Sequence, residues 1–450
     1  MNNNRLTALI YIWYLMFCCA QSYAQTQAPI AADLNIRKNL TNNQLLDLVQ
    51  KQTFRYFWDF AHPVSGMARE RNTTSKNFGN NVVTTGGTGF GIMATIVAAD
   101  RKFIPRKEAA THTLKIVDFL LKADRFHGAY PHWLNGETGK VIPFSKKDDG
   151  ADIVETSYLF QGLLTARQYY TANNPVEKDI RIKIKQLWDG VEWDWFTQNK
   201  NVLYWHWSPN YAWDMNMPIK GWNECLITYV MAASSPTHAI SKPVYTEGWP
   251  GGNTFINGKT YYGKYTLPLG PDYGGPLFWT QYSFLGLNPH GLKDQYADYW
   301  QQAINHTLIN REYCIENSLK YKGYGANCWG LTASDSWQGY SGHSPTNDLG
   351  VITPTAALSA FPYAPQYAMQ ALRHFYEDLG DKIWGEYGFT DAFSEQHDWY
   401  AKTYLAIDQG PIIVMIENYR SGLLWKLFMS SPDVKNGLNK LGFSAPGLHN

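Results

Sequence analysis

The sequence has few charged residues and no long run of charge of one sign. Lysine and arginine number 39 against 38 for aspartate and glutamate, the formal net charge is +1, and only 17% of residues are charged. Nucleic acids and anionic membrane surfaces are bound through basic stripes or patches. We therefore expect neither of them to be the partner of this chain.

The motifs of several common chemistries are also missing. The chain contains no His-Glu-x-x-His, no Cys-x-x-Cys, no Gly-x-Ser-x-Gly and no phosphate-binding loop. The glycine-rich residues 86–91 lack the spacing of a dinucleotide fingerprint, so we interpret them as close packing at a helix start. The 12 histidines show no ligand spacing. We expect no cofactor and no metal.

The N-terminus has the features of a secretory signal peptide. Arg5 precedes an apolar run over residues 6–20 that is too short to span a bilayer, and Ser22-Tyr23-Ala24 offers the small residues that a signal peptidase reads. We expect residues 1–24 to be removed, giving a periplasmic or secreted protein with no other membrane association.

Cysteine is scarce, and two of the five cysteines lie in the signal segment. A lipid anchor on Cys18 is the less favoured alternative, because Phe17 before it fits a lipoprotein signal poorly. The three remaining cysteines, Cys225, Cys314 and Cys328, allow at most one disulfide. Cys314 and Cys328 are the nearer pair, but spacing alone does not decide whether they are joined.

Helical periodicity dominates the rest of the chain. Apolar residues recur at spacings of three and four, with Pro or Gly at the segment ends. The predicted helices cover residues 43–61, 88–99, 106–123, 151–172, 177–196, 222–234, 277–287, 294–315, 354–361, 365–379, 410–418 and 422–429. Roughly twelve antiparallel helices with long connections predict an all-α toroid of helix pairs, whose loops form a cleft at one end.

Two segments break the helical pattern. Residues 129–144 and 253–269 alternate in character and contain Asn135-Gly136 and Asn257-Gly258, so both are predicted to be β-hairpins inserted between helices. The polar residues 25–40 are predicted to be a linker, which leaves residues 41–450 as a single domain.

Aromatic residues are abundant. The chain has 18 Trp, 30 Tyr and 21 Phe, together 15% of its residues, which is more than core packing alone explains. Sugar rings present apolar faces and polar edges, so aromatic platforms with a few acids are typical of a carbohydrate site. The acids of the chain are therefore its candidate reacting groups.

Asp152 and Glu155 lie three residues apart, on one face of the first turn of an apolar helix. Helix capping is the alternative for acids in this region, including Asp148 and Asp149. The apolar neighbours of Glu155 predict that its side chain points inward.

Glu224 lies between Trp222 and apolar Leu226, with no basic residue nearby in the sequence. Such an acid is protonated more readily than usual, as a proton donor must be, although a Glu bonded to the backbone is the alternative. Asp408 precedes Gly410-Pro411, which predicts a position just outside a helix N-terminus. A further acid, Glu417, follows in that helix.

Several motifs resemble the glycoamylase-like family of bacterial β-1,2-glucanases, glycoside hydrolase family 144. They are residues 328–335, 343–348, 354–358, 388–393, 406–411 and 417–422, within a match over about residues 44–443. The resemblance implies an (α/α)6 toroid and an exported enzyme that cleaves β-1,2-glucan with inversion, giving sophorose or short oligosaccharides. We expect it to act as a monomer.

The resemblance also assigns site residues. The family's key acids correspond to Glu224, Asp152, Glu155 and Asp408. Glu224 is the expected proton donor, and Asp408 is preferred over Asp152 and Glu155 for activating water. An inverting pair stands about 6.5–9.5 Å apart. The predicted substrate-binding residues are Trp222, Trp329, Asp335, Trp337, Tyr340 and His343.

Two other classes of function remain open. A sugar epimerase or polysaccharide lyase on the same toroid would use His343 or Tyr340 as its base. A non-catalytic glucan-binding protein would keep the aromatic residues and not need the acids. The sequence does not distinguish cleavage inside a glucan chain from release of disaccharides at its end.

Overall fold

The computed structural model describes residues 28–73 and 79–448. The chain divides into two units, Met1–Ala31 and Ala32–Asn450, and the account below concerns the second unit. The predicted signal peptide, with Cys18, lies outside the described residues. Among the helices that the structure describes, none has the length and apolar character needed to cross a bilayer.

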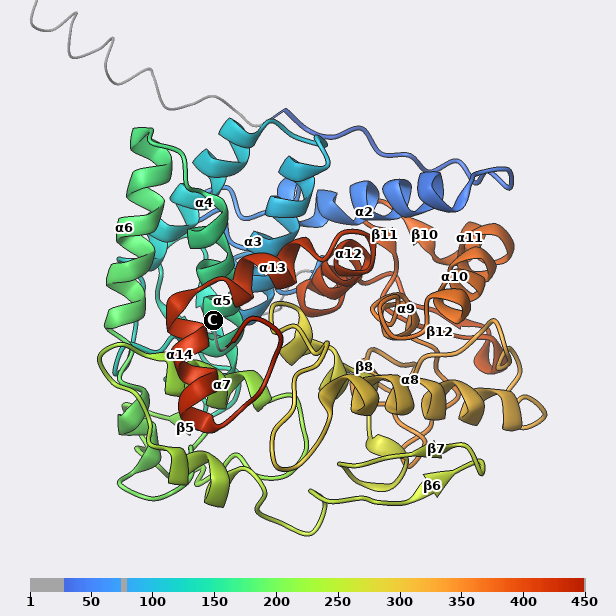
Figure 1. The fold of residues 1–450 in the computed structure, drawn as a ribbon. Coiled ribbons are helices and arrows are strands. Elements are labelled where there is room, and N and C mark those ends of the chain that lie inside the picture. Colours follow the sequence, from blue (N-terminus) through green and yellow to red (C-terminus); the bar gives the residue numbers. More distant parts are fainter. Residues whose placement is uncertain (1–27, 74–78, 449–450) are drawn as a thin grey trace, which may run out of the picture. The chain divides into compact units, whose positions relative to one another are not determined.

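The second unit is mainly helical, as predicted (Figure 1). Its α-helices are α2 (Asn42–Trp58), α3 (Thr85–Asp100), α4 (Arg106–Leu120), α5 (Ile153–Tyr169), α6 (Pro175–Asp189), α7 (Leu226–Ser234), α8 (Tyr299–Glu316), α9 (Pro354–Leu358), α10 (Pro365–Arg373), α11 (Gly380–Ile383), α12 (Ala406–Arg420), α13 (Leu423–Met429) and α14 (Pro432–Leu441). Shorter helical turns are η1 (Trp193–Thr197), η2 (Val244–Gly248), η3 (Asp272–Gly274), η4 (Leu277–Thr280), η5 (Tyr282–Phe284), η6 (His374–Asp378) and η7 (Glu395–His397).

The helices form two concentric layers. Helices α3, α5, α7, α9 and α12 are buried on nearly every side, because they are apolar all round. They pack in the order α12, α3, α5, α7, and the turns η4 and η5 continue this ring from α7 towards α9, which returns to α12. Amphipathic helices such as α4, α6 and α10 pack outside it. This is the predicted (α/α)6 toroid.

The strands are short and antiparallel, and they lie between helices. They are β1 (Val82–Thr84), β2 (Trp133–Asn135), β3 (Val141–Ile142), β4 (Ala151–Asp152), β5 (His206–Trp207), β6 (Thr260–Tyr261), β7 (Tyr265–Thr266), β8 (Ala333–Ser334), β9 (Ser341–Gly342), β10 (Trp384–Gly385), β11 (Gly388–Phe389), β12 (Phe393–Ser394) and β13 (Trp399–Tyr400). The order β1-β2-β3 makes one sheet, and the others pair two by two: β4 with β5, β6 with β7, β8 with β9, β10 with β11, and β12 with β13.

Both predicted hairpins are present. Strands β2 and β3 pair within residues 129–144, and β6 pairs with β7 within residues 253–269. The predicted turn of the second hairpin is wrong, because the chain reverses at Tyr262-Gly263, both with positive φ. The Asn257 side chain donates instead to the carbonyls of Gly270 and Pro271.

Residues 277–287 form the two 3-10 turns η4 and η5 and not the predicted helix. The amides of Leu277 and Phe278 donate to Leu331 and Thr332, which ties this segment to its neighbour. Helices α11 and α14 were not predicted. The ends of α14 carry ordinary signals, with Pro432 at its start and Gly442 in the left-handed region after its end.

Glycines allow α3 and α5 to touch backbone to backbone. A Cβ atom on Gly89 would lie 2.1 Å from the Tyr158 carbonyl oxygen, and one on Gly162 would lie 2.1 Å from the Gly89 carbonyl oxygen. The interpretation of residues 86–91 as close packing is confirmed.

The three cysteines of this unit, Cys225, Cys314 and Cys328, are buried free thiols.

Candidate active site

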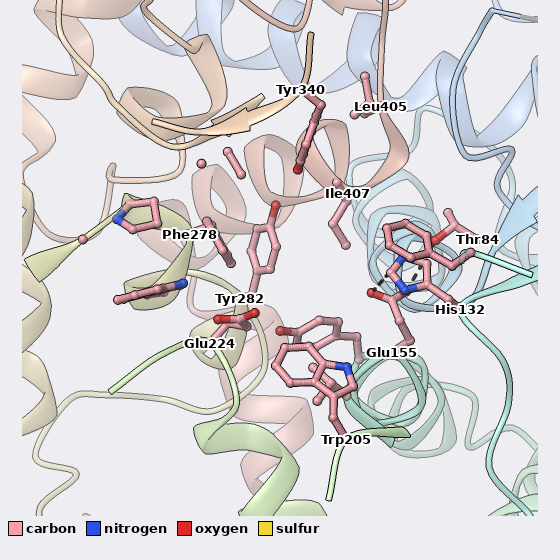
Figure 2. A pocket seen from close by; sticks show the side chains of 18 of the residues that line it. Thr84, His132, Glu155, Trp205, Glu224, Phe278, Tyr282, Tyr340, Leu405 and Ile407 are labelled. Atoms are coloured by element: carbon pink, nitrogen blue, oxygen red, sulfur yellow. Dashed lines mark hydrogen bonds and ion pairs between the residues drawn. The ribbon is translucent and has the colours of Figure 1, made fainter. Parts of the chain in front are cut away.

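A cavity of about 730 Å³ lies at the N-terminal ends of the inner helices. Thr84 precedes α3, Glu155 lies in the first turn of α5, Glu224 lies just before α7, and Ile407 lies in the first turn of α12 (Figure 2). Its aromatic lining consists of Trp133, Phe144, Tyr158, Trp205, Phe278, Trp279, Tyr282 and Tyr340. Backbone N–H groups at helix N-termini favour negative charge, so the cavity is suited to carboxylates.

Glu224 lines the cavity in a setting that favours its protonated form. Burial, followed by the negative charges of Asp152 and Glu155, raises the pKa of Glu224 to about 7. The Ser283 hydroxyl donates to the Glu224 carbonyl at 2.7 Å, which ties this residue to η5. A carboxylic acid that holds its proton near neutral pH is able to donate it to a leaving group.

Asp152 is an ionised acid held behind the cavity lining. It is the N-cap of α5, where its Oδ1 accepts from the amides of Val154 and Glu155 at 2.9 Å. Its Oδ2 lies 3.2 Å from His132 Nδ1 and 3.5 Å from His206 Nε2. Burial opposes ionisation, but the two imidazoles hold the pKa of Asp152 well below its usual range.

The two imidazoles are held in their charged form by the same acids. Burial lowers the pKa of each imidazole. For His132 the acids Glu155 and Asp152 raise the pKa by more than burial lowers it. For His206 the acids Asp148 and Asp152 do the same. Both pKa values rise to about 9. The residue that caps α5 is Asp152, and not Asp148. Asp148 instead pairs with His206 at 3.2 Å.

Glu155 points into the cavity, as predicted from its neighbours. Its Oε2 accepts from the Gly86 amide at 2.7 Å, and its Oε1 lies 3.9 Å from His132 Nε2. Burial raises the pKa of Glu155 and the nearby His132 cation opposes this rise. Glu155 and Glu224 reach the cavity from opposite sides in Figure 2.

Asp408 lies deeper than the sequence predicts. Helix α12 begins at Ala406 and accommodates Pro411, so Asp408 is in the first turn and not outside the helix. It is 1% exposed, does not line the cavity, and accepts from the Tyr282 hydroxyl at 3.4 Å. Burial and the charge of Asp391 raise its pKa well above the usual range.

Asp391 and Asp408 form a buried carboxyl pair. Burial raises the pKa of both, and the charge of Asp391 raises that of Asp408 further, so at least one of the two carboxyl groups is favoured in its protonated form. Burial, then the charge of Asp335, raises the pKa of Asp391 to about 7. Asp335 in turn donates its amide to Asp391 at 2.7 Å and pairs with Arg71 at 3.2 Å. Asp335 thus reaches the cavity through Arg71, which lines it.

Of the four aromatic residues predicted as sugar platforms, Tyr340 lines the cavity. Trp222 and Trp329 lie in the core instead, at 2% and 0% exposure, because both pack among other apolar side chains. Trp337 is 42% exposed but lies against His397, outside the cavity lining. His343 is fully buried, which lowers its pKa to about 4, and it does not line the cavity.

Several cavity residues were not predicted. His132 stacks on Phe144 with ring centroids 4.1 Å apart, and Arg71 joins Glu70 at 2.9 Å to Asp335. The aromatic residues of η4 and η5 lie within or next to residues 279–286, which resemble a motif of the glycoamylase-like family. The sequence therefore did contain a signal for these residues. No local pattern around His132 or Arg71 distinguishes either residue from other polar residues.

This architecture defines a class: an (α/α)6 toroid whose cavity combines aromatic walls with carboxyl groups in different electrostatic settings, a combination suited to a sugar chain. A family profile described as "Putative glucoamylase" matches residues 216–432. A solved structure of the same description from Bacteroides uniformis is 60% identical, with a TM-score of 0.89, over 91% of this chain and 99% of that one. The chain belongs to the glycoamylase-like family, as its motifs predicted.

Two relatives have more specific descriptions. An endo-β-1,2-glucanase from Chitinophaga pinensis, solved with sophorotriose and glucose, is 57% identical with a TM-score of 0.88, over 90% of this chain and 99% of that one. An exo β-1,2-glucooligosaccharide sophorohydrolase acting at the non-reducing end, from Parabacteroides distasonis, is 47% identical over 424 residues. That match covers 89% of this chain, which spans only 58% of the relative's length.

Proposed function

We propose that this chain hydrolyses β-1,2-glucan and releases sophorose or short β-1,2-glucooligosaccharides. The observation that carries the proposal is Glu224, a cavity acid whose pKa is raised to about 7 and which lies across from a second carboxyl group, Glu155. The linkage is taken from the relatives described above, which act on β-1,2-glucans or their oligosaccharides.

The proposed reaction is a single displacement with inversion. Glu224 donates its proton to the glycosidic oxygen as the bond from that oxygen to the anomeric carbon breaks. A water molecule attacks the same carbon from the opposite face and gives its proton to a carboxylate. The first carbon of one glucose residue thus gains a hydroxyl group, and the other fragment leaves as an alcohol.

Glu155 suits the water-activating role better than Asp408. Glu155 lines the cavity, and although burial raises its pKa, the nearby positively charged His132 opposes this rise. Asp408 is enclosed, does not line the cavity and has a pKa raised well above the usual range by burial, so it is less suited to accept a proton from water in the cavity. We assign Asp408 to holding Tyr282, whose ring lines the cavity.

Incubation with linear β-1,2-glucan, starch, cellulose and laminarin, followed by sizing of the products, tests the proposal. We expect cleavage of β-1,2-glucan alone. The time course separates the two modes described for the relatives, because internal cleavage gives a ladder of sizes and terminal release gives sophorose from the start. Proton NMR of the first product gives its anomeric form and tests inversion. Comparable rates on starch would contradict the assigned linkage.

The two rival functions have less support. A lyase or epimerase base at His343 would have to act from outside the cavity lining. A pure binding protein does not need an acid with a raised pKa.

We further propose that the chain is exported through its signal peptide, begins at Gln25 when mature and acts as a monomer. Mass spectrometry of the native protein tests the mature N-terminus, and light scattering tests the monomer.

A further inference from the structure

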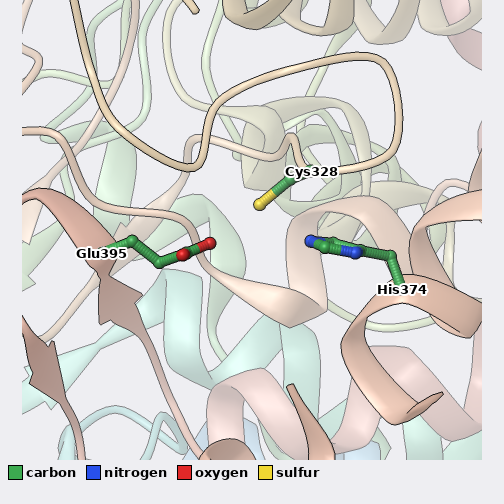
Figure 3. Close-up of side chains that lie close together, drawn as sticks. All are labelled: Cys328, His374 and Glu395. Atoms are coloured by element: carbon green, nitrogen blue, oxygen red, sulfur yellow. The ribbon is translucent and has the colours of Figure 1, made fainter. Parts of the chain in front are cut away.

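A second group of chemically reactive side chains lies away from the cavity. Cys328, His374 and Glu395 come from three separate segments, and their side chains converge (Figure 3). One ligand atom of each lies within 4.8 Å of the others. None of the three lines the cavity, and the proposed hydrolysis uses none of them.

The imidazole of His374 is oriented by a hydrogen bond on its far nitrogen. His374 Nδ1 lies 2.9 Å from the Asp378 carboxylate, which leaves Nε2 for another partner. A metal-binding histidine characteristically gives its other ring nitrogen to a carboxylate in this way. Residues His374–Asp378 also form a π-helical turn, a distortion that occurs often at functional sites.

The Glu395 carboxylate is half-buried. Within residues 28–73 and 79–448 it accepts no hydrogen bond and forms no ion pair in the structure. Gly323 lies against it, and a Cβ atom there would approach Glu395 Oε1 to 2.7 Å. An anionic oxygen held beside a thiol and an imidazole is an arrangement that a cation would stabilise.

The thiol of Cys328 is 3% exposed and free. Its loop is closed by two backbone hydrogen bonds between Gly325 and Cys328, which fix the direction of the side chain. A bound metal ion would replace the thiol proton.

We propose that Cys328, His374 and Glu395 bind a zinc ion that joins three segments of the chain. One sulfur, one nitrogen and one oxygen ligand match the donors that Zn²⁺ takes in tetrahedral sites, whereas Ca²⁺ and Mg²⁺ take oxygen ligands. A tetrahedral zinc ion holds its ligand atoms roughly 3–4 Å apart, so small side-chain movements close this group on the ion. A water molecule would complete the coordination.

The position of the site indicates what the ion would do. It would join the loop that ends at Cys328 to the end of α10 and to the segment after β12. Trp329 follows Cys328 directly, and the chain then reaches the cavity at Ala333 in β8. The ion would therefore anchor one end of the segment that carries Asp335 and Tyr340.

The test uses the full mature chain, stripped with a chelator and titrated with zinc chloride by calorimetry, and with cobalt chloride by absorption spectroscopy. We expect a single ion per chain, a cobalt–thiolate charge-transfer band, and a higher melting temperature with zinc. C328S, H374A and E395Q should each weaken zinc binding by more than tenfold, and C328S should abolish the cobalt–thiolate band. The matched control C314S replaces a buried thiol outside the group and should keep both.

A variant at an exposed position keeps the proposal falsifiable if C328S misfolds. Asp378 is exposed, and D378N removes only the partner of His374 Nδ1, so zinc affinity should fall about 10- to 100-fold. The control D381N, at an exposed neighbour, should bind zinc normally. Absence of zinc binding, binding unchanged by D378N and H374A, or a Cys314–Cys328 disulfide in the purified protein would overturn the proposal.

Discussion

Glu224 and Glu155 lie on opposite sides of one cavity, each at the N-terminal end of a different inner helix (Figure 2). The negative charge of Glu155 is among the causes that raise the pKa of Glu224. The two acids are therefore electrostatically linked. Ionisation of one favours the protonated form of the other, which gives a donor and an acceptor at the same pH.

Replacing Glu224 should abolish most of the turnover and leave the fold intact. E224Q removes the proton donor, so we expect kcat on β-1,2-glucan to fall by about 10²- to 10⁴-fold. The melting temperature should change little, because the side chain faces a cavity. Reducing-end assays and thermal unfolding measure the two effects. The control E247Q, at an exposed acid, should have normal activity.

The roles of Glu155 and Asp408 are separable by comparing E155Q with D408N. If Glu155 activates water, E155Q should lose about 10²- to 10⁴-fold in kcat, and D408N should lose less because Asp408 is enclosed and does not line the cavity. On an activated aryl glycoside that the enzyme accepts, E224Q should be partly rescued, since such a leaving group needs no proton, and E155Q should not. A larger and unrescued loss in D408N would return the water-activating role to Asp408.

The rate should fall as the pH rises through about 7. Glu224 must be protonated to donate, and its pKa is raised to about 7, so kcat/KM should show an alkaline limb near that value. A pH profile of kcat/KM measures this limb. E224Q has no titrating donor and should lose it, whereas an unchanged alkaline limb in E224Q would assign it to another group.

Stability should also decline in mildly alkaline solution. The pKa values of His132 and His206 are raised to about 9 in the folded state, against about 6.5 for unfolded histidine. Their contribution is complete below about pH 6.5 and is lost as the pH rises through about 9. Thermal unfolding from pH 6 to pH 10 should show this decline, and H206Q should be less stable at pH 6 and less sensitive to pH. An H206Q curve parallel to that of the parent would contradict the assignment.

The ion pair of Arg101 and Glu417 should be important for stability. Glu417 is 0% exposed and makes two hydrogen bonds with Arg101, at 2.7 and 2.9 Å. R101A leaves this carboxylate unpaired, so the free energy of unfolding should fall towards the lower end of about 3–5 kcal/mol, since Arg101 is 23% exposed. Denaturant titration measures the loss. R37A breaks an exposed pair and should cost about 0–1 kcal/mol, so equal losses would contradict this account.

The local sequence contains enough information to predict the acidic residues at the N-terminal ends of α5 and α7. Glu155 lies in the first turn of α5 and on the cavity, as its position and apolar neighbours predict, and Glu224 also lies on the cavity. Asp152 is instead the N-cap of α5, behind the cavity lining. The local sequence does not predict in which direction a side chain points. A Trp beside a reactive Glu fits a sugar platform and a core residue equally well, and Trp222 is a core residue.

The rest of the site depends on contacts between distant segments. The register of β4 and β5 places Asp152 opposite His206, and Arg71 reaches Asp335 across the cavity rim. No spacing along the chain encodes such pairings. The same reason explains why the cysteine and histidine pattern gave no sign of the group at Cys328, whose members come from three segments.

The contact between Gly89 and Gly162 has a consequence for how this site tolerates change. Main-chain atoms meet where α3 and α5 approach most closely, and Gly86 on α3 holds the Glu155 carboxylate through its amide. Substitutions of side chains elsewhere in the core should therefore leave the position of the Glu155 carboxylate unchanged. Variation in the η4 and η5 turns, or in the segment around Tyr340, is free to reshape the walls of the cavity while this carboxylate keeps its place.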